Sequence, residues 1–149
     1  MVFVYKGFSM INKYIETLQK HGLKRTPKRL EVLRILSEES AYISPQKLHV
    51  LLKEKFLKIG LPTVYRILQQ FQNIGIVTSI QQDDNQLYYY LCDCVEKHHH
   101  FICRKCHKVS CLTYCDFDNI KQLVADQLDS LAETHVLQIE GLCKECLES

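Results

Sequence analysis

Residues 98–106 read His-His-His-Phe-Ile-Cys-Arg-Lys-Cys, and residues 143–146 read Cys-Lys-Glu-Cys. Two residues between the thiols of a pair let both sulfurs of a tight turn reach one ion, and two such turns complete a tetrahedral thiolate set that suits Zn²⁺. The long gap between the pairs predicts strands and a helix within it. We therefore predict one structural zinc per chain. Its predicted ligands are Cys103, Cys106, Cys143 and Cys146.

Two disulfides are the alternative use of these four cysteines, and they would require an oxidising compartment. Residues 1–10 lack the basic start, apolar core and cleavage site of a secretory signal, and both Met1 and Met10 are candidate first residues. No apolar run is long enough to cross a membrane. We therefore expect a cytoplasmic chain whose eight cysteines are metal ligands or reactive thiols.

The charge of the chain is unevenly distributed. Residues 1–91 carry 13 Lys and Arg against 7 Asp and Glu, whereas residues 92–149 carry 6 against 10. A basic segment is typical of a domain that binds a polyanion, although an ordinary solvated surface would explain the same excess of basic residues. The sequence pattern changes at the same point, so we predict two domains, residues 1–91 and 92–149.

The basic half predicts several short helices followed by a hairpin. Helical spacing of apolar residues, and caps followed by proline, mark the helices, while a turn-rich segment separates the two strands. This order describes a winged helix-turn-helix, in which the last helix enters the major groove of DNA. The predicted helices span about residues 12–21, 26–37, 45–56 and 61–73, and the predicted strands span residues 77–80 and 87–91.

The last predicted helix has an apolar stripe on one side, so Tyr65, Arg66 and Gln69 face the other way. A merely solvated face is the alternative, but such a face usually includes Glu or Asp. Tyr, Arg and Gln suit base edges or the thymine methyl, and Lys and Arg suit phosphates. The predicted contacts with double-stranded DNA are Lys24, Arg25, Lys28, Thr63, Tyr65, Arg66 and Gln69.

The acidic half predicts a small α/β unit closed by the second Cys pair. Strands are expected at residues 101–103, 108–112 and 135–139, and a helix at residues 118–131. Such a unit has little core of its own, so we expect it to pair with a second copy across its sheet edge. The predicted class is α+β, an N-terminal winged helix-turn-helix plus a small C-terminal α/β dimerisation domain.

Four features together resemble the ferric uptake regulator family of bacterial metal-dependent repressors. They are residues 22–29, the run Thr63-Val64-Tyr65-Arg66, the histidines before Cys103, and the closing Cys pair. The resemblance covers nearly the whole chain from about Ile11. It implies a homodimer that binds a palindromic operator when a sensing metal is bound, with the helix of Arg66 against the DNA.

The resemblance also implies a sensing site between the two domains, where a metal fixes their relative angle and hence the separation of the recognition helices. His98 and His100 match the family's His-x-His motif and would share one face of a strand. Cys92 stands where relatives have an acid or, in zinc sensors, a Cys, and Cys111 stands where an acid is usual. Cys94 competes with Cys92, and Cys111 is alternatively a buried apolar thiol.

The sensed metal is predicted from the ligands that this set contains. A histidine in the third helix of iron and peroxide sensors is replaced by Tyr42, and an acid or His that some zinc sensors use after the recognition helix is replaced by Thr78. The remaining two thiols and two imidazoles favour four-coordinate Zn²⁺. We therefore predict a repressor of zinc uptake genes with zinc as the regulatory metal; an iron-responsive or peroxide-sensing regulator is the alternative. The predicted sensing ligands are Cys92, His98, His100 and Cys111.

Three other residues match a further metal site of some relatives, namely His99, Asp118 and His135, although hydrogen-bonded surface residues are an equal alternative. An enzyme is not expected, because four thiols leave no open position on a zinc ion and because a strand, rather than a helix, follows Cys106. A zinc-bearing interaction module without a DNA role would leave the run at residues 63–66 unexplained.

Overall fold

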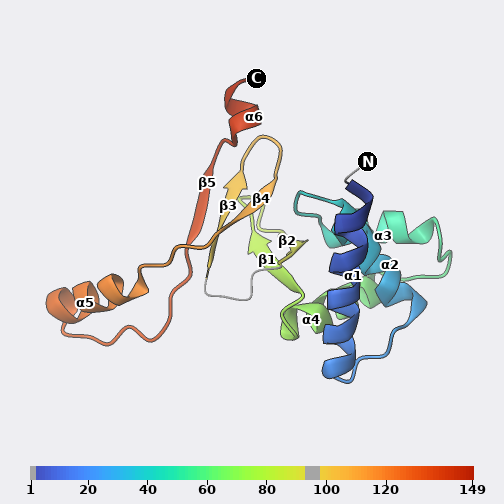
Figure 1. The fold of residues 1–149 in the computed structure, drawn as a ribbon, viewed down its shortest axis with the longest axis horizontal. Helices are drawn as coiled ribbons and strands as arrows, with labels where there is room; N and C mark the ends of the chain where they lie inside the picture. The colour runs from blue at the N-terminus through green and yellow to red at the C-terminus, as the bar shows by residue number, and fades with distance from the viewer. Residues whose placement is uncertain (1–2, 93–97) are drawn as a thin grey trace. The chain divides into compact units, whose positions relative to one another are not determined.

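The computed structural model describes residues 3–92 and 98–149, with side chains from residue 11 onward. The chain forms two compact units, Met1–Asp93 and Cys94–Ser149 (Figure 1). The sequence predicted the division between residues 91 and 92. Cys94, the competitor of Cys92 for the sensing site, lies outside the described residues.

In residues 3–92 of the N-terminal unit, four helices precede the strands. The first begins earlier than the predicted residue 12, because residues 3–11 contain no proline and continue the helical spacing of apolar residues through Val4, Phe8 and Ile11. The others begin where the sequence predicted or within one residue of it. The helices are α1 (Phe3–Lys20), α2 (Pro27–Glu38), α3 (Pro45–Lys53) and α4 (Leu61–Asn73).

Side-chain caps fix the first turns of α2 and α3. The Thr26 hydroxyl accepts a hydrogen bond from the Arg29 N–H at 3.4 Å, and the Ser44 hydroxyl accepts one from the Lys47 N–H at 3.1 Å. A proline follows each cap at the first helical position, where its missing N–H costs no hydrogen bond. The Thr26 cap therefore holds the basic first turn of α2 at a defined place beside α4.

The helices pack around the apolar stripe of α4. Val64, Leu68 and Phe71 are completely buried in this core. Leu18 of α1, with apolar residues of α2 and α3, surrounds them. Because one face of α4 is fixed against the core, Tyr65, Arg66 and Gln69 are exposed on the other, as the sequence predicted.

An antiparallel hairpin of β1 (Val77–Gln81) and β2 (Leu87–Leu91) completes the winged helix-turn-helix. Asn85 at its tip has φ 60°, a left-handed conformation that Asn tolerates in turns. The Asp84 carboxylate accepts hydrogen bonds from the Gln86 N–H at 2.9 Å and the Tyr88 hydroxyl at 2.7 Å. These bonds hold the turn, and a bridge between Ile43 and Tyr89 ties the hairpin to the segment before α3.

The C-terminal unit has a three-stranded sheet in the order β4-β3-β5, with β3 antiparallel to β4 and parallel to β5. The predicted α+β class is confirmed, but several predicted boundaries of this unit were wrong, including the start of β3, the end of α5 and both ends of β5. Asp129, with φ 48°, ends the helix before residue 131, and the last strand begins after residue 135. The elements are β3 (His99–Cys103), β4 (Val109–Leu112), α5 (Phe117–Leu128), β5 (Gln138–Gly141) and α6 (Lys144–Leu147).

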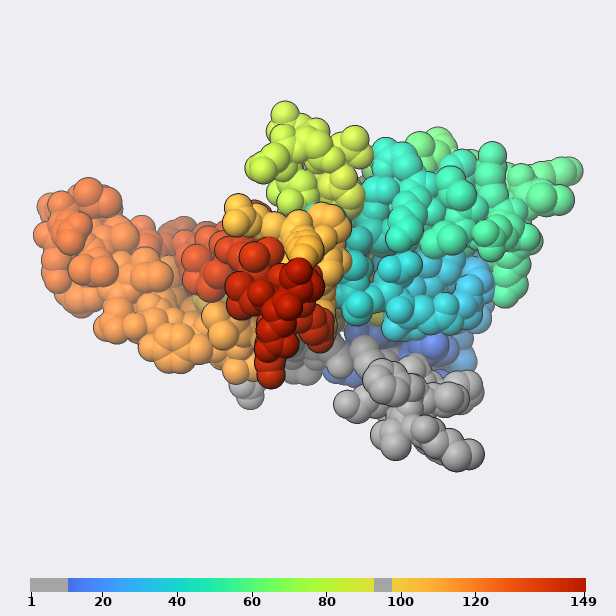
Figure 2. Space-filling view, turned by 90° about the horizontal axis from the view of Figure 1, so that it is seen from above, coloured from blue at the N-terminus to red at the C-terminus, as the bar shows by residue number. Residues whose placement is uncertain are grey.

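Helix α5 projects from the sheet of its own unit (Figures 1 and 2). It carries large apolar side chains that are exposed. Ile120, Leu123 and Leu128 are 42, 54 and 68% exposed. Apolar side chains gathered on one face usually mark an interface. Among residues 3–92 and 98–149, no helix combines the length and the apolar character that crossing a membrane requires.

Candidate metal centres and DNA-reading surface

The parallel pairing of β3 and β5 brings the two Cys pairs together. Cys103 is the last residue of β3, and its partner in the register is Gly141, just before Cys143. The Arg104 N–H donates to the Gly141 carbonyl at 2.8 Å. A Cβ atom at Gly141 would lie 3.1 Å from the Phe101 ring, so glycine allows the close approach of the two strands.

The four cysteines of these pairs form one cluster, in which the sulfurs of Cys103, Cys106, Cys143 and Cys146 lie within 4.8 Å of one another. The Cys106 and Cys143 sulfurs are 3.7 Å apart. A tetrahedron with Zn–S bonds of about 2.3 Å has sulfur–sulfur edges of about 3.8 Å, whereas a disulfide bond is about 2.05 Å long. The four thiols are free, and the cluster has the dimensions of a tetrathiolate zinc site.

The electrostatics of this cluster also suit a cation. Backbone hydrogen bonds from Cys106 and Cys143 lower the pKa of Cys103 to about 5. Desolvation, together with the Cys143 and Cys103 sulfurs, raises the pKa of Cys146 to about 12. Deprotonation of Cys103 is therefore favoured, whereas deprotonation of Cys146 is opposed by its neighbours. A divalent cation among the sulfurs would remove that opposition, because it stabilises each thiolate.

A second group gathers beside the strand pair β3–β4. His100 and Cys111 are partners in the antiparallel register, and the His98 Nε2 lies 3.1 Å from the His100 Nε2. The ligand atoms of these three residues lie within 4.8 Å of one another. Desolvation and the neighbouring His98 lower the pKa of His100 to about 4, so its imidazole is neutral and has a lone pair for a metal at neutral pH.

Cys92, the fourth predicted member of this group, belongs to the N-terminal unit. It directly follows β2, and its N–H donates to the Ile76 carbonyl at 3.2 Å. Tyr42, which replaces the third-helix histidine of iron and peroxide sensors, lies before α3 rather than in it. Its ring centroid is 4.7 Å from that of Tyr88. Thr78 lies on β1.

The third predicted group is only partly assembled. His99 and His135 do meet, with their Nε2 atoms 3.2 Å apart. Asp118 does not join them, because its side chain is fully exposed and lies 3.9 Å from the Lys121 ammonium. The third member of the cluster is instead Cys115, which the sequence analysis did not assign to any site. The one feature of the sequence that could have indicated Cys115 is its position three residues before Asp118.

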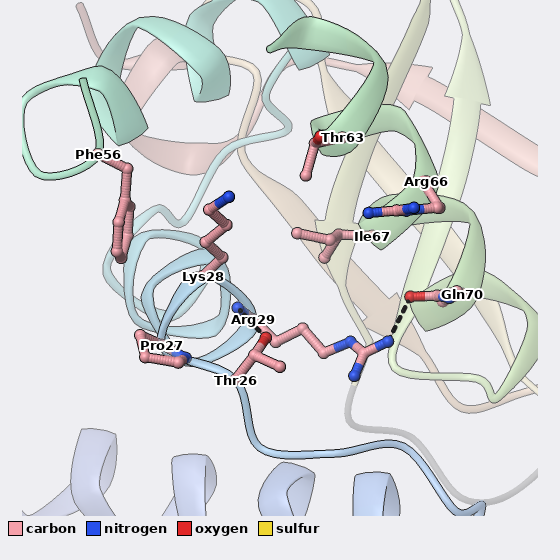
Figure 3. A pocket seen from close by; sticks show the side chains of 9 residues that line it. All are labelled: Thr26, Pro27, Lys28, Arg29, Phe56, Thr63, Arg66, Ile67 and Gln70. Carbon is pink, nitrogen blue, oxygen red and sulfur yellow. Dashed lines mark hydrogen bonds between the residues drawn. The ribbon is translucent and has the colours of Figure 1, made fainter. Parts of the chain in front are cut away.

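Basic side chains of α2 and α4 border a cavity of about 590 Å³ on the N-terminal unit. Lys28 and Arg66 extend toward it from the two helices (Figure 3). A cavity with cations on both sides suits the phosphates of a nucleic acid. Of the predicted DNA contacts, three lie at this cavity, namely Lys28, Thr63 and Arg66. The others, Lys24, Arg25, Tyr65 and Gln69, are exposed elsewhere on the unit.

Arg29 is a further basic residue at this cavity that the sequence analysis did not select. Its guanidinium donates to the Gln70 side-chain oxygen at 2.8 Å (Figure 3). It also donates to the Lys24 carbonyl at 2.8 Å. These bonds join the first turn of α2 to α4 and fix the position of the charge. The Tyr65 hydroxyl accepts a hydrogen bond from the Gln46 amide at 3.2 Å, which orients that ring in the same way.

Comparison with known proteins supplies the context for these sites. A model described as the ferric uptake regulator family matches residues 20–140. The chain is 30% identical over 138 residues to the peroxide-responsive repressor PerR of Staphylococcus epidermidis, covering 93% of this chain and 91% of that protein. It is 33% identical over 135 residues to the ferric uptake regulation protein of Staphylococcus aureus, covering 91% and 96%. A solved zinc uptake regulator complexed with zinc and DNA has a TM-score of 0.77 and 27% identity, covering 95% of each chain.

Proposed function

Because the chain belongs to the ferric uptake regulator family, whose members are transcriptional regulators and not enzymes, we propose that it is a zinc-responsive repressor of zinc uptake genes. It would act in the cytoplasm as a homodimer on a palindromic operator. The single observation that carries the choice of zinc is the sulfur of Cys111, which lies beside the imidazoles of His98 and His100.

The donor atoms favour a soft, four-coordinate ion at this sensing site. Thiolate and imidazole ligands suit tetrahedral Zn²⁺, whereas Fe²⁺ and Mn²⁺ sites usually include carboxylate oxygens. We propose Cys92 as the fourth ligand, since it precedes His98 by six positions in the chain. The likeness to a solved zinc uptake regulator supports this choice. The alternative is an iron-responsive or peroxide-sensing regulator, because the relatives include a ferric uptake regulation protein and a peroxide-responsive repressor.

Metal binding would control DNA binding through the connection between the two units. Cys92 belongs to the unit that carries the Arg66 helix, and His98, His100 and Cys111 belong to the other. An ion that binds all four would restrict the angle between the units. In a dimer it would thereby select one separation of the two recognition helices, which is how a ligand shifts a two-state equilibrium. The separate tetrathiolate cluster would hold the structural zinc.

DNA binding should therefore depend on added zinc. We expect protein that keeps its structural zinc to bind its preferred duplex about 5- to 150-fold more tightly when the sensing site is loaded with Zn²⁺, a range typical of coupling between sites. The duplex would be enriched from a random library by the protein loaded with Zn²⁺, Fe²⁺ or Mn²⁺ in turn, and affinity measured by fluorescence anisotropy at fixed salt. Enrichment of a duplex with Fe²⁺ alone would mean that the regulatory metal is iron and not zinc. No enrichment with any metal would refute a DNA-binding role.

The uncovered face of α5 supplies the proposed dimer interface. Replacing Leu123 with Asp should raise the dimer dissociation constant by at least about 100-fold, because each of the two symmetric sites loses apolar burial worth about 1.5–3 kcal/mol. Light scattering during size-exclusion chromatography measures the change. Leu57→Asp is the matched control, since Leu57 is 85% exposed in the N-terminal unit. A Leu123→Asp protein that stays dimeric at the same concentration would exclude α5 from the interface.

A further inference from the structure

A hydrogen bond joins the outer face of α4 to the helix before it. The Gln46 amide, in the first turn of α3, donates to the Tyr65 hydroxyl at 3.2 Å. Both side chains are exposed, and that of Tyr65 lies on the face of α4 opposite the core. Only Tyr65 was selected from the sequence as a DNA contact. The bond makes Gln46 part of the same surface.

The backbone around Gln46 is held in place by its neighbours in the chain. Pro45 begins α3 after the Ser44 cap, so Gln46 lies in a well-defined first turn. Directly before this turn, the Ile43 N–H donates to the Tyr89 carbonyl and the Tyr89 N–H donates to the Ile43 carbonyl, each at 2.9 Å. Gln46 is therefore anchored to the hairpin as well as to the helices.

The phenol of Tyr65 has a second neighbour on the hairpin. Burial raises the pKa of Tyr89 on β2, and the nearby phenol of Tyr65 raises it further. Tyr89 is buried, so its ring does not move freely. Contacts with both α3 and β2 restrict the orientations of the Tyr65 ring before any DNA binds. Such preorganisation lowers the cost of forming a specific contact.

The direction of the bond between Gln46 and Tyr65 decides which partners remain open to the hydroxyl. An amide nitrogen only donates, whereas a hydroxyl has one hydrogen to donate and lone pairs that accept. A hydroxyl that accepts from Gln46 keeps its hydrogen for an acceptor on the solvent side. DNA offers phosphate oxygens and, in the major groove, N7 of purines, O6 of guanine and O4 of thymine as acceptors. The amino groups of adenine and cytosine are donors, so they do not suit this hydrogen.

We propose that Gln46 is a positioning residue that turns the Tyr65 O–H toward a hydrogen-bond acceptor of the DNA. The inference rests on the DNA-binding function proposed above and specifies which chemical groups of the duplex Tyr65 contacts. In the free protein, water competes for this exposed bond, so the bond contributes little to stability. In the complex, DNA displaces that water, and a hydrogen bond is stronger at the lower local dielectric. We therefore expect the bond to affect DNA binding rather than folding.

A double-mutant cycle between positions 46 and 65 tests this role, with the duplex that the wild-type protein enriches and affinity measured by fluorescence anisotropy at fixed salt. Gln46→Met keeps the length of the side chain without its amide, and it should weaken binding about 2- to 10-fold, the range of one net hydrogen bond. In a Tyr65→Phe background, the same change should alter affinity by less than about twofold, as expected when the interaction is already absent. Gln46→Glu offers an acceptor instead of a donor, so it should turn the hydroxyl hydrogen away from the DNA and weaken binding more than Gln46→Met.

Val50→Glu is the matched control for the added negative charge, because Val50 is 63% exposed one turn further along α3. It should weaken binding less than Gln46→Glu does. If the acceptor belongs to a base, Gln46→Glu should also change the preference at one position of the duplex. If the acceptor is a phosphate oxygen, Gln46→Glu should weaken binding equally for all duplexes. Both outcomes support the proposal and identify the acceptor.

Three results would overturn the proposed role of Gln46 while leaving the DNA-binding function intact. The first is an equal loss of affinity for Gln46→Met with and without Tyr65→Phe. The second is a Gln46→Glu protein that binds DNA as tightly as Val50→Glu. The third is a lower melting temperature for Gln46→Met that accounts for its loss of affinity, since the role would then be structural. Wild-type protein that enriches no duplex would overturn both this inference and the function on which it rests.

Discussion

Replacing Cys103 with serine should release the structural zinc that we propose for the tetrathiolate cluster, and it should unfold the C-terminal unit. In the described part of that unit, the buried apolar side chains are Ile102, Cys103 and Phe117, which is too small a core to hold a domain. Structural zinc contributes about 10–16 kcal/mol in zinc-finger peptides, as much as the whole stability of a typical domain. Because Cys103 ends the central strand, its loss would also separate β3 from the segment of Cys143.

Three measurements would follow the effect of the Cys103 substitution. Zinc content should fall from one ion to none at the tetrathiolate cluster, thermal unfolding should lose the transition of the C-terminal unit, and light scattering should show a monomer. Cys111→Ser is the matched control, because Cys111 is a cysteine of the same unit that lies outside this cluster. A Cys103→Ser protein that remained a zinc-containing dimer would rule out the tetrathiolate assignment.

Local chemistry explains which parts of the fold were predictable from the sequence. The starts of α2 and α3 depend on Thr26 and Ser44, whose caps act within four residues, so a cap followed by proline was sufficient. The exposed face of α4 followed from the apolar spacing of the same helix. The four tetrathiolate ligands could be predicted because Cys pairs with two intervening residues constrain the geometry before any tertiary structure is known.

The features that the sequence did not reveal depend on contacts between distant segments. The end of α5 was placed too late because Leu131 continues its apolar spacing, although Asp129 adopts the left-handed conformation that stops the helix. Cys115 joins His99 only through the tertiary fold, so its position three residues before Asp118 carried no weight. Arg29 resembled an ordinary helix residue until its bond to Gln70 placed it at the basic cavity.

Replacing Arg66 with alanine should weaken operator binding about 5- to 150-fold, since one good bidentate contact from arginine to a base is worth about 1–3 kcal/mol. Arg66 is exposed on α4 and borders the same cavity as Lys28 (Figure 3). The side chain lies on the face opposite the buried stripe, so its removal leaves the core unchanged. Metal content and the dimer should therefore be preserved while DNA affinity falls.

Two further variants separate the role of the Arg66 side chain from its charge. Arg66→Lys keeps the positive charge but loses the planar guanidinium, which can donate two parallel hydrogen bonds to a base. Compared with Arg66→Ala, it should therefore restore attraction to the phosphates but not discrimination between bases. If Arg66 contacts a base, Arg66→Ala should relax the sequence preference at one position of the duplex. If Arg66 contacts only a phosphate, binding should weaken equally for all duplexes, and the slope of log affinity against log salt concentration should fall by about one. Arg104→Ala, an exposed arginine of the C-terminal unit, controls for net charge. Unchanged anisotropy titrations for Arg66→Ala, or a parallel loss of zinc and dimer, would show that α4 does not read DNA through this residue.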